Sequence, residues 1–145
     1  MTDNNKKENI FEEIERAKKA REAAQILFEK GLVMDAISRL YYCLLYHIRA
    51  LLLSEGLEVR SHDGALRLFS LYFVKRGIFL PEDSHVFSRL MKYREEADYD
   101  PSSVFTDEDF QNLFQETETL TRKIKNFLKS NVFYGAALYG QSGIL

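Results

Sequence analysis

Residues 34–54, which read MDAISRLYYCLLYHIRALLLS, decide the fold predicted for this chain. The middle of this stretch is apolar nearly all round, interrupted by His47 and Arg49, and Arg39 stands where it begins. Gly56 follows, close to where a helix C-terminus favours glycine. A helix that is apolar on most faces belongs in the centre of a bundle, where it contacts several neighbours. The stretch therefore predicts a central helix.

Four more amphipathic helices are predicted around this one. Apolar residues recur every three or four positions from about residue 9 up to Gly31, which indicates the first helix. Capping and breaking residues place the others at about 61–75, 81–99 and 107–129. Short connections between long helices imply antiparallel neighbours. The predicted fold is thus all-α, an up-and-down antiparallel bundle of four to five helices.

The chain divides into a bundle, residues 1–131, and an apolar tail, residues 132–145. The tail reads VFYGAALYGQSGIL and carries no charged residue. An apolar segment of this kind is unfavourable in water, so it would pack on its own bundle or on a partner subunit. A mobile tail is the alternative, and the sequence leaves the two open.

Composition narrows the classes of partner. The 145 residues are 46% hydrophobic and 29% charged, as in an ordinary globular domain. The net charge of -2 gives no global basic field, so we expect no binding to duplex DNA. The single cysteine, Cys43, is most simply a small buried apolar residue, with a nucleophile as the alternative. No stretch approaches the length of a membrane-spanning helix, and we expect a cytoplasmic protein.

Standard catalytic and metal-binding patterns are absent from the sequence. The glycines are isolated at predicted helix ends, so they form no phosphate-binding loop. The three histidines, His47, His62 and His85, fall on three different predicted helices, without the spacing of a zinc pair. We therefore predict neither a metal nor a cofactor.

Arg39 is the first candidate for binding a ligand. The spacing of three and four residues places Arg39, Tyr42 and Tyr46 on one helix face. A guanidinium beside tyrosine hydroxyls could hold a phosphate or a carboxylate. The alternative is an ion pair between Arg39 and a carboxylate of a facing helix, because buried charges are usually paired.

Further candidates lie at two other helix ends. Arg94 and Asp98 form an i, i+4 pair with Tyr99 beside them, immediately before the helix must end. His62 begins a helix, where it could bind an anion or transfer a proton. The alternatives are a surface ion pair for Arg94 and Asp98, and a capping role for His62.

Three pieces of this sequence together resemble the HEPN family of helical proteins from prokaryotes. They are Ala36-Ile37-Ser38-Arg39-Leu40-Tyr41-Tyr42, Ser61-His62-Asp63-Gly64 and Arg94-Glu95-Glu96-Ala97-Asp98-Tyr99. The pattern of a serine-histidine pair followed by Arg-x-x-Ala-Asp-Tyr is similar to that of a subgroup of small stand-alone members. The resemblance spans about residues 9–129.

The resemblance implies a bundle that is usually dimeric, has a polar groove, and is often encoded beside a minimal nucleotidyltransferase. Many members are metal-independent endoribonucleases or toxins of toxin–antitoxin pairs, with an Arg-x4–6-His motif. Here Arg94 is followed at that distance by Tyr99 and Asp100, and Arg39 and His47 are separated by seven residues. The ribonuclease motif is therefore absent, and any catalysis would need His62 together with Arg94.

Three functions follow as hypotheses. The first is a HEPN-like module that binds a nucleotide or an RNA phosphate and pairs with a nucleotidyltransferase in a toxin–antitoxin-type pair; its ligand-binding residues are Arg39, Tyr42, His62, Arg94, Asp98 and Tyr99. The second is a structural or interaction homodimer without a ligand. The third is a metal-independent endoribonuclease toxin that uses His62 and Arg94.

Overall fold

A computed structural model describes residues 2–132 of the chain, and these residues are almost entirely helical. The helices are α1 (Asp3–Glu29), α2 (Val33–Ser54), α3 (His62–Phe69), α4 (Pro81–Tyr99) and α5 (Asp107–Asn131), and a short π-helix, η1 (Ser70–Val74), continues α3. No strand occurs in this part of the chain. The prediction of an all-α bundle is confirmed, whereas the tail beyond Val132 lies outside the described residues.

Two helices differ from their predicted bounds. The first helix starts at Asp3 and not near residue 9, because the Thr2 hydroxyl accepts a hydrogen bond from the Asn5 N–H and caps an extra polar turn and a half. The third helix changes at Ser70 from α to π geometry, and the Lys75 N–H donates to the Ser70 carbonyl at 2.8 Å. Neither polar capping beyond the apolar stripe nor a π turn changes the hydrophobic period, so the sequence pattern did not reveal them.

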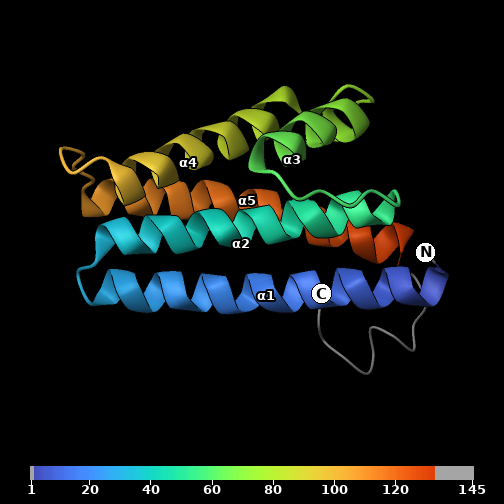
Figure 1. The fold of residues 1–145 in the computed structure, drawn as a ribbon, viewed down its shortest axis with the longest axis horizontal. Helices are drawn as coiled ribbons and strands as arrows, with labels where there is room; N and C mark the ends of the chain where they lie inside the picture. Colours follow the sequence, from blue (N-terminus) through green and yellow to red (C-terminus); the bar gives the residue numbers. More distant parts are fainter. Residues whose placement is uncertain (1, 133–145) are drawn as a thin grey trace.

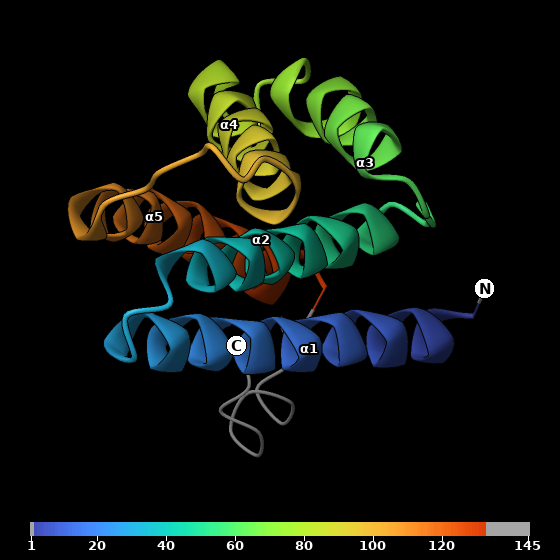
Figure 2. The same cartoon turned by 60° about the vertical axis from the view of Figure 1, so that its left-hand side comes forward.

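Helix α2 lies in the middle of the bundle, as predicted. Helix α1 packs along one side of it, and α4 and α5 pack on its other faces (Figures 1 and 2). Thirteen residues of α2 are buried, among them Leu44, Ile48 and Leu51 with no exposed surface. Their burial supplies the apolar contact that stabilises the bundle. No helix in the described part of the chain is long and apolar enough to cross a membrane.

The connection between α2 and α3 positions the candidate site. Residues 55–61 turn back over α2 before α3 begins, so that His62 lies beside Tyr41 in the first half of α2 (Figure 1). The distance along α2 from Ser54 back to Tyr41 is about 20 Å at 1.5 Å per residue. Seven extended residues span at most about 23–25 Å. The connection is therefore just long enough to bring His62 to the middle of the bundle.

Candidate functional site

Five of the six predicted ligand-binding residues converge on one cluster. Arg39 and Tyr42 come from α2, His62 is the first residue of α3, and Arg94 and Asp98 come from the last turns of α4. The sixth, Tyr99, is 75% exposed, and within residues 2–132 it has no hydrogen bond or ring contact with the others. The three elements that supply the cluster contact one another, and Figure 2 shows α3 and α4 next to α2.

The ring of Tyr42 is surrounded by cationic and polar groups. The guanidinium carbon of Arg39 lies 5.1 Å from the centre of this ring, and that of Arg94 lies 6.0 Å from it. The His62 ring approaches edge-on, with a centroid separation of 6.2 Å. Arg39 forms no ion pair in the described part of the chain, so the alternative predicted for it is not what the structure contains. Two guanidinium groups therefore face one aromatic ring, which is a cation–π arrangement.

Arg94 is a buried cation. Its exposed fraction is 6%, its guanidinium lies 5.1 Å from the centre of the Tyr41 ring, and its ion pair with Asp98 measures 3.6 Å between Nη1 and Oδ2. The pair thus joins a buried guanidinium to an exposed carboxylate, which differs from an ion pair between two exposed side chains. The Arg94 Nε is buried and has no hydrogen-bond acceptor among the described residues. A buried donor without an acceptor is costly, so the arrangement is suited to an additional acceptor.

Asp98 connects the same end of α4 to α2. Its Oδ2 accepts a hydrogen bond from the Ser38 hydroxyl at 3.3 Å, although its side chain remains partly exposed. The Asp98 carboxylate therefore anchors Arg94 from one side and leaves most of the five guanidinium N–H groups unused. The sequence prediction did not include Ser38. Its position next to Arg39, within the Ala36–Tyr42 run, was the one indication that it belongs to the site.

Tyr41, which the prediction also missed, joins the cluster to α3. It has no exposed surface, and its hydroxyl makes a hydrogen bond with Nδ1 of His62. Burial raises the pKa of Tyr41 well above its ordinary range. Burial, and then the charge of Arg94, lower the pKa of His62. The face argument selected Tyr42 and Tyr46, and it gave no reason to expect that the adjacent Tyr41 would contact another helix.

The start of α3 holds His62 in place. The Ser61 hydroxyl accepts a hydrogen bond from the Gly64 N–H at 3.0 Å, so the N-cap is Ser61 and not His62. A Cβ at position 64 would lie 2.5 Å from the Ser61 hydroxyl oxygen and 3.2 Å from Val59 Cγ1. A side chain at this position would therefore displace the capping hydroxyl of Ser61, which gives a structural reason for a glycine three residues after the cap.

Cys43 and His47 lie in the core and do not take part in the cluster. Burial raises the pKa of the Cys43 thiol to about 12, so it is not a nucleophile near neutral pH. Burial lowers the pKa of His47 to about 4, and its Nδ1 lies 2.8 Å from the Cys43 carbonyl oxygen, to which it donates. The structure thus explains the position of His47 without a catalytic role.

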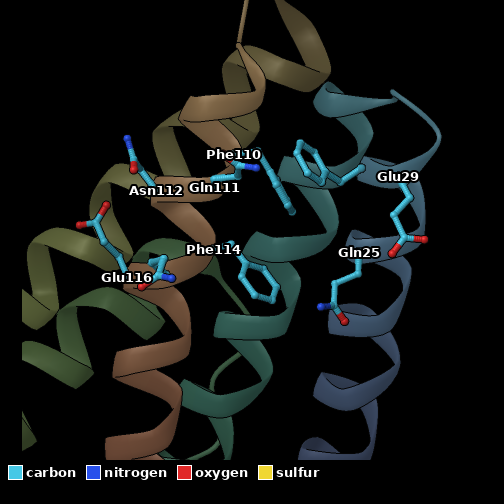
Figure 3. Close-up of a pocket in the computed structure, with 9 residues that line it drawn as sticks. Gln25, Glu29, Phe110, Gln111, Asn112, Phe114 and Glu116 are labelled. Atoms are coloured by element: carbon cyan, nitrogen blue, oxygen red, sulfur yellow. The ribbon is translucent and has the colours of Figure 1, made fainter.

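A separate groove with a volume of about 1040 Å³ lies between α1 and α5 (Figure 3). Phe110, Phe114 and Gln25 line it, and Glu29 and Glu116 lie among its lining residues. None of the six predicted site residues does so. A groove with an apolar wall and carboxylates is unsuited to an anion, so the cluster on α2, α3 and α4 remains the candidate anion site.

The cluster offers hydrogen-bond donors and positive charge, which suits an oxyanion. Guanidinium groups match phosphate geometry, and a partly desolvated setting strengthens such contacts. Within residues 2–132, no group of three or more His, Cys, Asp or Glu side chains could hold a metal ion. The cluster itself brings together two guanidinium groups, which are hydrogen-bond donors and carry positive charge.

Comparisons with known proteins show the family to which the chain belongs. The model of the HEPN domain matches residues 12–127. The chain is 34% identical over 123 residues to "Putative toxin MJ0605" of Methanocaldococcus jannaschii, covering 85% of this chain and 91% of the relative. It is 30% identical over 126 residues to a "UPF0332 protein" of Thermotoga maritima, covering 86% and 96% of the two chains. A further relative, "Putative toxin MJ0142" of M. jannaschii, is 31% identical over 123 residues and is covered over 84% of each chain.

Proposed function

Because the chain belongs to the HEPN family, we propose that it is a toxin-type HEPN protein whose cluster binds the phosphate of a nucleotide or of RNA. The observation that carries this proposal is Arg94, a buried guanidinium that faces two tyrosine rings and has an Nε without an acceptor. A phosphate would supply acceptors to Arg94 and to Arg39, whose guanidinium faces the same ring of Tyr42. The names of two archaeal relatives support the toxin part.

Titration with adenosine 5′-monophosphate tests the binding site. We expect the wild type to bind, and Arg39→Gln and Arg94→Gln each to weaken binding by about tenfold or more, the size of a lost charge-assisted hydrogen bond. Arg39 is only half-buried, so Arg39→Gln keeps the test valid if the buried Arg94 variant is unstable. Arg67→Gln is the matched control, because Arg67 is exposed on α3. Equal affinities for all four proteins would refute the site.

The proposed partners are a second copy of the chain and a minimal nucleotidyltransferase. Light scattering of the full chain should give the mass of a homodimer, and deletion of residues 133–145 tests whether the tail contributes to it. Co-expression with the nucleotidyltransferase expected from the neighbouring gene should give one complex on size exclusion. Separate elution of the two proteins at micromolar concentration would count against this partner.

A metal-independent endoribonuclease is the second candidate, because His62 and Arg94 both contact Tyr41. The His62 Nδ1 meets the Tyr41 hydroxyl, and the Arg94 guanidinium lies 5.1 Å from the centre of the same ring. An imidazole and a guanidinium this near each other could act on one phosphodiester. RNA cleavage in the presence of a chelator should then be lost in His62→Ala. Equal cleavage, or none in either protein, would reject this candidate.

A further inference from the structure

The burial of Tyr41 determines which group is the donor in the hydrogen bond between Tyr41 and His62. Tyr41 is fully buried, and among residues 2–132 its hydroxyl has one hydrogen-bond partner, Nδ1 of His62. A buried O–H group needs an acceptor. If His62 carried a proton on Nδ1, the ring would donate to Tyr41 and the phenol proton would have no acceptor. The Tyr41 O–H therefore donates to an unprotonated Nδ1.

We propose that Tyr41 is a positioning residue that holds His62 as a neutral imidazole with its proton on Nε2, so that His62 serves the anion site as a donor and not as a base. Which ring nitrogen of a histidine carries the proton is set by the hydrogen bond of the other nitrogen. This inference rests on the proposed anion site. Tyr41 thereby determines which nitrogen of His62 can donate to the ligand.

The charged groups around His62 agree with a neutral ring. Arg94 on α4 and Arg49 on α2 disfavour the imidazolium, whereas Asp63 on α3 and Glu95 on α4 favour it. Burial and Arg94 outweigh the two carboxylates, and they lower the pKa of His62. Protonation of Nδ1 would in addition reverse the hydrogen bond with Tyr41. The ring is therefore uncharged at neutral pH.

The protonation state of His62 limits the kind of ligand that the site can bind. The side chains of Arg39, Arg94 and His62 then all present N–H donors at neutral pH, and none of the three can accept a proton from the ligand. The site consequently suits an anion that is already ionised, such as a phosphate. It also means that His62 in this state cannot take the proton of a ribose 2′-hydroxyl as a general base would.

Nitrogen NMR of the full-length protein tests the inference without any ligand. Long-range 1H–15N spectra near pH 7.5, with the His62 signals assigned by His62→Gln, should show Nδ1 unprotonated and Nε2 protonated. In Tyr41→Phe the pKa of His62 should rise, because the donor that favours the neutral ring is gone. If Tyr41 instead accepted a hydrogen bond from His62, the same substitution would lower that pKa. Tyr93→Phe is the control, since Tyr93 packs on Phe105 outside the cluster.

A binding titration gives the second readout. Tyr41→Phe should weaken the binding of adenosine 5′-monophosphate by about three- to tenfold near pH 7.5, because His62 is no longer oriented. Affinity should recover below the pKa of His62, where both ring nitrogens carry protons, and a merely structural defect would not recover. A proton on Nδ1 in the wild type, or a lowered His62 pKa in Tyr41→Phe, would overturn the proposal. If the NMR result is as expected but no nucleotide binds, the proposed anion site is rejected and the role of Tyr41 in positioning His62 stands.

Discussion

The buried His47 should make the bundle sensitive to acid, and the magnitude follows from its surroundings. Burial lowers the pKa of His47 from 6.5 to about 4, so between these values the unfolded chain binds more protons than the folded one. The stabilisation due to His47 is therefore present above pH 6.5 and is lost as the pH falls toward 4. The whole shift corresponds to about 3 kcal/mol, of which about 2 kcal/mol is lost between about pH 7 and pH 5.

Urea unfolding measures this loss. The free energy of unfolding of the wild type and of His47→Gln would be compared at about pH 7 and pH 5, with His85→Gln as a control because His85 is exposed. The wild type should lose about 2 kcal/mol more than His47→Gln on acidification, whereas His85→Gln should follow the wild type. The same pH dependence in the wild type and in His47→Gln would show that His47 is not held neutral in the core, and the reasoning would fail.

Three further predictions concern packing and capping. Gly64→Ala should lower the free energy of unfolding by about 1 kcal/mol in urea titrations, because the new Cβ would displace the capping hydroxyl of Ser61; no change would contradict the cap argument. Glu13→Gln should cost about 1–3 kcal/mol, since the buried Glu13 pairs with arginines of α1 and α2, and the exposed Glu12 makes Glu12→Gln the control. The thiol of Cys43 should react with a disulfide reagent only after unfolding, and rapid reaction in the native protein would show that the residue is accessible.

The positions of most helix boundaries could be predicted because local chemistry sets them. Gly31 ends the first helix with a φ of 79°, and the Ser61 and Thr106 hydroxyls accept capping hydrogen bonds from Gly64 and Asp109. Such capping interactions involve residues only three or four positions apart, so they can be predicted from the sequence. The extra turns from Asp3 and the π geometry after Phe69 were missed because neither alters the apolar period.

The candidate site was predicted in its residue types and in the contacts within one helix, but not in the contacts between helices. Arg39, His62 and Arg94 were selected as polar side chains at unusual places on predicted helices. The hydrogen bond between Tyr41 and His62 could not be predicted from the sequence pattern. It joins positions 21 residues apart, and it depends on how far residues 55–61 return along α2. The period of the apolar residues indicates which face of a helix is buried. It does not indicate which residue of another helix contacts that face.

By itself, the sequence determined the all-α class, the central place of α2 and most helix ends, because burial pattern and capping are local properties of the chain. The spacing along α2 already placed Arg39 beside Tyr42, but only the tertiary structure decided that Arg94 of α4 faces the same ring and is buried. It also decided that Tyr41 meets His62. The physical reason is that Arg94 and His62 come from other helices than the two tyrosines, so their contacts depend on how α3 and α4 are placed along α2, and a shift of one turn, about 5.4 Å, would break them.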